Sequence, residues 1–158
     1  MADTILALLQ SAALYNAAAK SLDFAANNHF LKAQATGVPL KQDSVNFNEM
    51  MGSFMGSIVL HAFALELLLK GLCMMRNIVY PKTHDLARLF ALLPEEDRAT
   101  AIAMYEQIDR GTTDGLEAVL RANANAFEEW RYQNEYKPQT ITSKQLGIAF
   151  VQLFKLTK

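Results

Sequence analysis

The feature that most constrains the fold is a 22-residue stretch, Phe54 to Met75, that is apolar on nearly every side when it is read as a helix. A stretch of this length can cross a bilayer. It contains His61, Glu66 and Lys70, however, and a charge in the middle of a membrane helix costs roughly 2.5–3.5 kcal/mol on insertion scales. We therefore expect no membrane span, and interpret the stretch as the central helix of a bundle, packed on two or more sides.

The polar residues of this helix fall on two faces. At about 100° per residue, Ser57 and His61 share one face, and Glu66 and Lys70 lie almost opposite. The last two are spaced i,i+4 with the acid first, which favours an ion pair. This pair is either exposed and worth about 0.3–0.5 kcal/mol, or partly buried and facing another polar group. We interpret His61 as a core histidine with one hydrogen-bond partner rather than as a ligand, and Cys73 as a packing residue.

Length and composition indicate one domain. With 158 residues and 51% apolar content, the chain can bury a core of ordinary size, so we expect a single helical domain over residues 1–158. The single cysteine excludes an internal disulfide. The first residues lack the basic start and cleavage pattern of a signal peptide, which predicts a cytoplasmic protein.

Charge and motifs exclude several classes of function. The net charge is −1 and no Lys/Arg-rich run occurs, so the sequence has no basic stripe for nonspecific nucleic-acid binding, although folding can still assemble a local basic patch. Histidine and cysteine are too sparse and scattered for a zinc site. Gly-rich phosphate loops, nucleophile elbows and CxxC motifs are lacking. We expect no metal and no cofactor.

The first part of the chain predicts a long amphipathic helix. Apolar residues recur at helical spacing from about Asp3 to Asn28, amid abundant alanine. Residues 33–48 break the period with Gly37 and Pro39, so we expect a connecting loop there. The central helix would then run from about Glu49 to Arg76.

Further helices follow from capping and stop signals. We expect Asn46 or Asn48 to cap the central helix, and Thr83 to cap a third helix with Asp85 in its first turn. The later signals are a proline start at Pro94 with an end near Gly111, a capping box of Asp114 and Glu117, and a last helix that begins at Thr142 or Ser143. No segment of useful length has a strand period. The predicted fold is all-α, an up-and-down bundle of about five or six helices.

Three segments, in this order and at this separation, resemble the HEPN superfamily, the higher eukaryotes and prokaryotes nucleotide-binding domain. They are AFALELLLKGL (Ala62 to Leu72), PKTHDLARLF (Pro81 to Phe90) and AFEEWRYQNE (Ala126 to Glu135). The resemblance covers residues 50–156 and is to the bacterial branch. It implies a HEPN-like helical bundle that commonly forms homodimers and occurs in bacterial toxin–antitoxin, defence and stress settings.

The resemblance also implies a candidate chemistry, from which the sequence departs. Many members are metal-independent RNases whose site is an Arg and a following His with four to six residues between them. Here the matching positions after Arg131 are Tyr136, Lys137 and Pro138, and the next His after Arg76 is His84, one residue beyond the usual spacing.

The candidate site residues are therefore stated as hypotheses. An Arg–His RNase needs a cation for phosphate charge and an imidazole for proton transfer. The candidates for catalysis are His84, Arg131 and Arg76. His84 is either such a residue or a turn residue bonded to backbone. Arg131 either belongs to a solvated network, or reaches Glu66 to lock two helices together, or acts in catalysis. The predicted polar groove comprises Glu66, Lys70, His84, Asp85, Arg131, Tyr132 and Glu135.

Three functions remain open from the sequence. The first is a degenerate, non-catalytic HEPN-like homodimer that binds a nucleotide, RNA or a protein partner. The second is a metal-independent endoribonuclease with a rearranged Arg/His site. The third is an interaction-only adaptor or antitoxin-like subunit.

Overall fold

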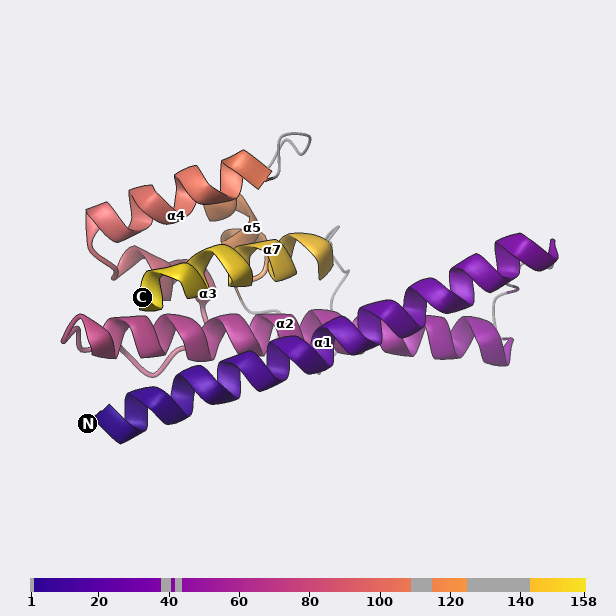
Figure 1. Cartoon of the computed structure of the whole chain (residues 1–158), viewed down its shortest axis with the longest axis horizontal. Coiled ribbons are helices and arrows are strands. Elements are labelled where there is room, and N and C mark those ends of the chain that lie inside the picture. The colour runs from indigo at the N-terminus through magenta and orange to yellow at the C-terminus, as the bar shows by residue number, and fades with distance from the viewer. Residues whose placement is uncertain (1, 38–40, 42–43, 109–114, 125–142) are drawn as a thin grey trace.

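The part of the chain that the structure describes is almost entirely helical (Figure 1). The computed structural model describes residues 2–37, 41, 44–108, 115–124 and 143–158. Six α-helices and no strand occur within these ranges, which confirms the all-α prediction. The elements are α1 (Ala2–Thr36), α2 (Val45–Met75), α3 (Leu86–Ala91), α4 (Glu95–Ile108), α5 (Leu116–Ala122), α7 (Ser143–Phe154) and a 3-10 turn, η1 (Lys155–Thr157).

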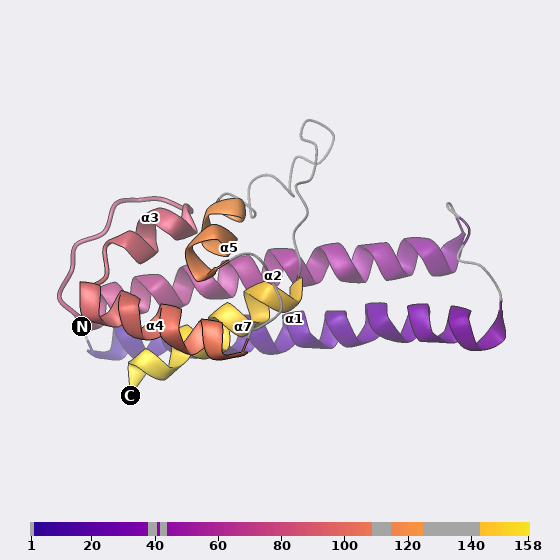
Figure 2. The same ribbon diagram turned by 90° about the horizontal axis from the view of Figure 1, so that it is seen from above.

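The two long helices form an antiparallel hairpin. α1 has 35 residues and α2 has 31, and they lie side by side along their length (Figure 2). Two glycines allow the close approach. A Cβ on Gly71 would lie 2.9 Å from Leu9 Cδ2, and a Cβ on Gly56 would lie 2.9 Å from Leu22 Cδ1. A larger side chain at either position would force these leucines to move.

The centre of α2 is the core of the protein. Its buried residues run from Ser57 to Cys73 and include Leu65, Leu68 and Leu69, which have no exposed surface. α2 is long and apolar enough to cross a membrane, but 61% of its most apolar 18-residue window is buried inside the protein. A membrane-spanning helix would expose that surface to lipid. Because α2 buries it against the rest of the protein, we interpret α2 as a core helix.

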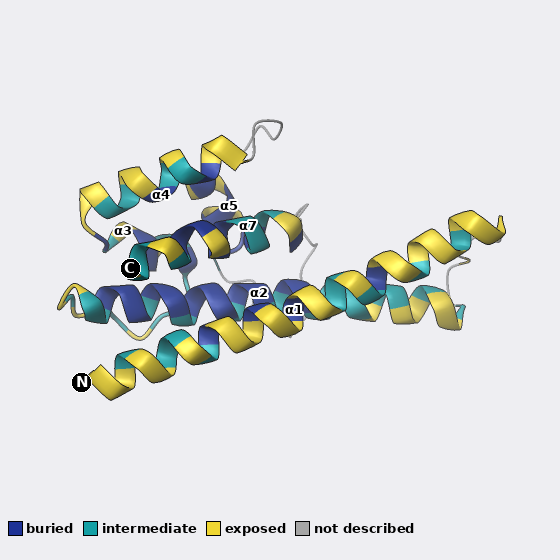
Figure 3. Cartoon of the chain, in the orientation of Figure 1, coloured by how far each residue is buried: buried dark blue, intermediate teal, exposed yellow. Residues whose placement is uncertain are grey.

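The remaining helices that the structure describes cover one end of the hairpin. α7 lies against α2, with α4 beyond it and the short helices α3 and α5 beside them (Figures 1 and 2). In chain order, α1, α2, α4 and α7 alternate in direction (Figure 1). At the other end, α1 has no buried residue after Ala26 and α2 has none before Ser57 (Figure 3).

The spacing of residues in the short helices predicts one buried stripe for each, and the structure confirms these stripes in the described ranges. They comprise Leu86, Leu89, Phe90 and Leu93 at α3, Leu116, Val119, Leu120 and Asn123 at α5, and Leu146, Ala149, Phe150 and Leu153 on α7. Phe154, the last residue expected in the stripe of α7, is only partly buried. Each set recurs at helical spacing, and burial of that face against α2 and its neighbours stabilises a helix too short to persist alone.

The expected connecting loop of residues 33–48 is too long. α1 continues to Thr36 because Ala33, Gln34 and Ala35 are good helix formers, and α2 starts at Val45. Ser44 is the N-cap, and its Oγ accepts a hydrogen bond from Phe47 N at 3.2 Å, so the expected caps Asn46 and Asn48 are wrong.

Two other helix starts also differ from expectation. The N-cap of α3 is Asp85 rather than Thr83, and its carboxylate accepts from Arg88 N at 2.9 Å. Thr83 Oγ1 instead accepts from Asp85 N at 3.1 Å. α5 starts one residue later than a capping box would require, with Gly115 as N-cap and no side-chain cap bond. The expected capping residue Asp114 and the expected helix end Gly111 lie outside the described residues.

Candidate functional site

Two polar clusters lie on α2, separated by about 140° around the helix axis. One joins Glu66 and Lys70 of α2 to His84, which precedes α3. The other is centred on His61 of α2 and reaches α1 and α7. We call them the Glu66 cluster and the His61 cluster. Their surroundings differ enough to assign them different roles.

The Glu66 cluster is built around a buried carboxylate. Glu66 is only 3% exposed. Its Oε1 accepts a hydrogen bond from Lys70 Nζ at 2.6 Å, and its Oε2 lies 2.9 Å from His84 Nδ1. A buried carboxylate is tolerated when it is paired and hydrogen-bonded in this way. Of the two alternatives for Glu66 and Lys70, the partly buried pair that faces another polar group is therefore confirmed, and the exposed pair is wrong.

His84 presents this cluster to solvent. Its side chain is 44% exposed, whereas that of Glu66 is 4% exposed. Because an ionised carboxylate can only accept a hydrogen bond, Nδ1 carries the proton in this contact. The contact with Glu66 shows that a side chain helps to hold His84, and the alternative of a turn residue bonded to backbone stays untested.

Neighbouring residues fix the position of His84. Asp85 caps α3 and so orients the backbone that carries His84. Lys70 Nζ lies 5.9 Å from the centre of the Tyr80 ring, within the range of a cation–π contact. The cluster thus combines an ammonium group, an imidazole and an aromatic ring at one place on the surface.

Arg76 is engaged elsewhere. Its Nε donates to Asp97 Oδ2 at 2.8 Å, and Nη2 donates to Asp97 Oδ1 at 3.1 Å and to the Leu156 carbonyl at 3.4 Å. This two-point bond to Asp97 raises the pKa of Arg76. Arg76 lies ten residues beyond Glu66, about 15 Å along the axis of α2. The structure therefore joins His84 to Glu66 and Lys70, and joins Arg76 to α4.

The other predicted groove residues lie outside the described residues. They are Arg131, Tyr132 and Glu135. The same holds for Tyr136, Lys137 and Pro138, and for the hypothesis that Arg131 reaches Glu66.

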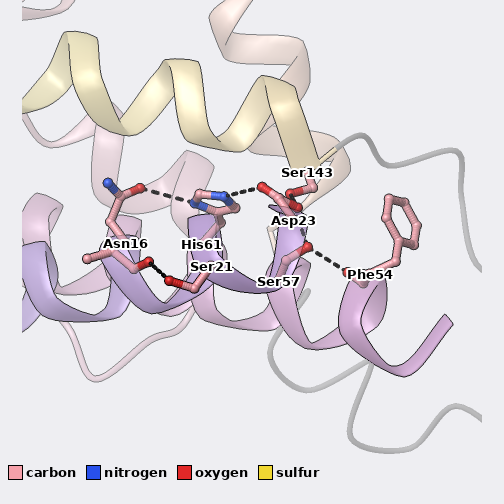
Figure 4. Close-up of polar contacts among 8 residues, drawn as sticks. Asn16, Ser21, Asp23, Phe54, Ser57, His61 and Ser143 are labelled. Carbon is pink, nitrogen blue, oxygen red and sulfur yellow. Dashed lines mark hydrogen bonds and ion pairs between the residues drawn. The ribbon is translucent and has the colours of Figure 1, made fainter. Parts of the chain in front are cut away.

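The His61 cluster crosses three helices (Figure 4). His61 Nδ1 lies 3.1 Å from Asn16 Oδ1, and Nε2 lies 3.1 Å from Asp23 Oδ2. Ser143, the first residue of α7, donates from Oγ to Asp23 Oδ1 at 2.5 Å. Ser57 Oγ lies 3.1 Å from Ser143 Oγ. The cluster therefore fixes α1, α2 and α7 relative to one another.

His61 is neutral in this setting. Burial has the largest effect and lowers the pKa of His61. The hydrogen bond and the charge of Asp23 raise this pKa by less, and the charge of Lys20 lowers it slightly further. A neutral imidazole has one N–H, which donates from Nε2 to Asp23. Nδ1 then accepts a hydrogen bond from Asn16 when the NH2 group of the Asn16 amide faces the ring. An imidazolium would instead donate to Asn16 Oδ1 and to Asp23 Oδ2. Burial decides for the neutral form, because a ring that is 1% exposed has no water to stabilise its charge.

Sequence reasoning found only part of this cluster. It placed Ser57 and His61 on one face and took His61 as a core residue, which the structure confirms, but with two partners rather than one. It missed Asn16, Asp23 and Ser143. One signal was present, because Asn16 falls in the buried stripe of α1, between Ala12 and Ala19.

A comparison with known proteins identifies the family. No curated protein and no solved structure gives a significant match. The family model of the HEPN domain matches residues 44–145, which is more than half of the chain. The match starts at Ser44, the N-cap of α2, and includes the whole Glu66 cluster. The chain therefore belongs to the HEPN family.

Proposed function

We propose that this HEPN protein is a homodimeric, non-catalytic binding protein that recognises RNA or a nucleotide through the Glu66 cluster. The observation that carries the proposal is the buried Glu66 carboxylate, which holds Lys70 and His84 together at the surface. A phosphate oxygen needs donors of this kind, and donors that are already positioned cost little entropy on binding.

The charges of the cluster suit one phosphate contact rather than many. Lys70 has three N–H donors and uses one on Glu66, so others remain for a ligand. The Tyr80 ring close to Lys70 offers a surface on which a base can stack. With a net charge of −1, the chain has no excess of basic residues for tight nonspecific binding. We therefore propose recognition of a short single-stranded segment or a free nucleotide.

The binding role is favoured over the family's nuclease role by the position of Arg76. Its guanidinium is bound to Asp97 at two points, about 15 Å along α2 from Glu66. An Arg–His nuclease needs both groups at one phosphate. We place the protein in the cytoplasm and, by the family's usual context, in a bacterial stress, defence or toxin–antitoxin setting. An adaptor or antitoxin-like subunit that binds only a protein partner is the alternative without a nucleotide ligand.

The test is a binding assay with fluorescently labelled single-stranded RNA, followed by anisotropy in EDTA over a range of salt concentrations. Lys70→Gln is expected to weaken binding and to reduce the salt slope by about 1. Lys155→Gln is the matched control, because it removes the same charge from η1, where Lys155 donates to Gln152 at 2.6 Å. Equal binding by the wild type and Lys70→Gln contradicts the assignment, and no affinity for RNA or nucleotides favours the adaptor role. Light scattering on the same fractions tests the homodimer.

The endoribonuclease is a second candidate because of one contact. Glu66 Oε2 lies 2.9 Å from His84 Nδ1, the arrangement in which a carboxylate orients a histidine as a general base. If the protein is an RNase, it should cleave RNA in EDTA, His84→Ala should abolish cleavage, and Glu66→Gln should slow it. RNA that stays intact at high protein concentration rules this candidate out.

A further inference from the structure

A groove lies beside the His61 cluster, between α1, α2 and the start of α7. Its volume is about 500 Å³, within the range typical of small-molecule sites. Its walls are mostly apolar. Figure 4 shows the Phe54 ring beside Asp23 and Ser143, on the opposite side of these residues from His61. Its lining includes Asp23, Phe30, Met50, Met51, Phe54 and Ser143.

Asp23 places a negative charge at this groove. Burial raises the pKa of its carboxyl, but hydrogen bonds from Ser143, Ser57 and His61 outweigh this effect and hold the pKa below its usual value. Asp23 is therefore ionised at neutral pH. Its side chain keeps 33% of its surface exposed, so the charge is accessible from the groove.

This charge has no cationic side chain paired with it in the part of the chain that the structure describes. The ion-pair partner of Asp23 within 4.0 Å is His61, which is neutral because of its burial. Lys144 also lines the groove, but it forms no ion pair with Asp23 among the described residues. The described lining of the groove therefore combines apolar walls with a carboxylate that forms no ion pair with a described lysine or arginine.

We propose that this groove binds a small organic cation, a protonated amine on an apolar body. The ammonium group would lie against Asp23, whose carboxylate has acceptor sites left after the bonds from Ser143 and His61. The body would lie between Phe30, Phe54 and the two methionines, whose flexible side chains adapt to different shapes. Aromatic rings near a cation add a further attraction. This site is separate from the Glu66 cluster, and the proposal does not depend on the RNA-binding function.

The first test compares three probes of similar shape by ligand-observed NMR. 4-Phenylbutylamine carries the cation, 4-phenylbutan-1-ol is its neutral counterpart, and 4-phenylbutyrate carries the opposite charge. We expect the amine to bind about tenfold more tightly than the alcohol, because a charge-assisted hydrogen bond is lost in the alcohol, and the anion to bind least. Equal binding of amine and alcohol, preferred binding of the anion, or no binding of the amine at millimolar concentration would each overturn the proposal.

The second test uses lining residues of opposite charge. Asp23→Asn should weaken amine binding by about tenfold, with its fold checked by circular dichroism. Because Asp23 also joins three helices, Lys144→Gln provides a variant that leaves those bonds in place. It should strengthen amine binding by a fewfold, since it removes a like charge from the groove. Lys155→Gln removes the same charge from η1, directly after the C-terminal end of α7, and should leave the affinity unchanged. Weaker amine binding by Lys144→Gln would contradict the proposal.

Discussion

The two clusters on α2 are built from the same pair of groups in opposite positions. In the His61 cluster the histidine is buried and Asp23 reaches solvent, whereas in the Glu66 cluster the carboxylate is buried and His84 reaches solvent. The group that reaches solvent determines what each cluster can offer a ligand. One offers a negative charge beside an apolar groove, and the other offers an imidazole and an ammonium group.

The comparison also separates structural from functional roles. His61 is held by side chains from α1, while the described members of the Glu66 cluster come from α2 and the segment before α3. The match to the HEPN domain covers residues 44–145 and so leaves out α1. The His61 cluster therefore depends on residues outside the matched region, whereas the described members of the Glu66 cluster all lie inside it.

The largest expected difference between the clusters is in stability. His61→Ala removes a ring that is 1% exposed and leaves Asn16 and Asp23 without their partner, so it should lower the free energy of unfolding by about 3 kcal/mol. His84→Ala, at a half-exposed position, should cost less than about 1 kcal/mol. Urea unfolding of both variants measures the difference. Equal losses would show that the two clusters do not differ in this way.

A smaller effect tests how firmly the His61 ring is held. A Cβ added at Gly147 would lie 3.2 Å from His61 Cε1, so the ring or α7 must shift slightly. Gly52 is the matched control, because it is also helical and a Cβ there meets nothing within 4 Å. Gly52→Ala should raise the melting temperature through a gain of about 0.5–1 kcal/mol, and Gly147→Ala should not. A similar gain in both would mean that the ring can move freely.

The smallest expected effect is a dependence on pH. Because burial lowers the pKa of His61 in the folded state, the unfolded chain takes up its proton first as the pH falls. Stability should therefore decline as the pH drops below about 6.5, and should level off once the folded state is protonated too. Asp23 adds a loss only at lower pH, since its own pKa is lowered. Unfolding experiments from pH 8 to pH 5 should show this slope in His84→Ala but not in His61→Gln.

Local patterns predicted most of the fold. Helical spacing of apolar residues was enough to predict the all-α class and the buried faces of α3 and α7, because each face depends on residues within one segment. The Glu66–Lys70 pair was predictable for the same reason, since its members are four residues apart. The residues at which α1 ends and α2 begins were harder to predict. Gly37 and Pro39 indicate a break in the helix but do not show how far each helix continues toward that break.

The site contacts were not predictable in this way because they join distant parts of the chain. His84 and Glu66 are 18 residues apart, His61 and Asp23 are 38 apart, and Ser143 and Asp23 are 120 apart. Such contacts depend on how the helices are placed against one another, and no single segment contains that information. Asn16 illustrates the difficulty, since its position in a stripe of alanines shows that it is buried but not what it contacts.

At the end of the hairpin without buried residues, the free energy of local opening should be lower than in the rest of α1 and α2. Beyond Ala26 of α1 and before Ser57 of α2, the structure has no buried residue in either helix. The backbone amides there should exchange their hydrogens after a local separation of two helices, without global unfolding. Amides around Leu65 should exchange only when the whole protein unfolds. One continuous helix, α2, would thus contain weakly protected amides at its start and strongly protected amides at its centre.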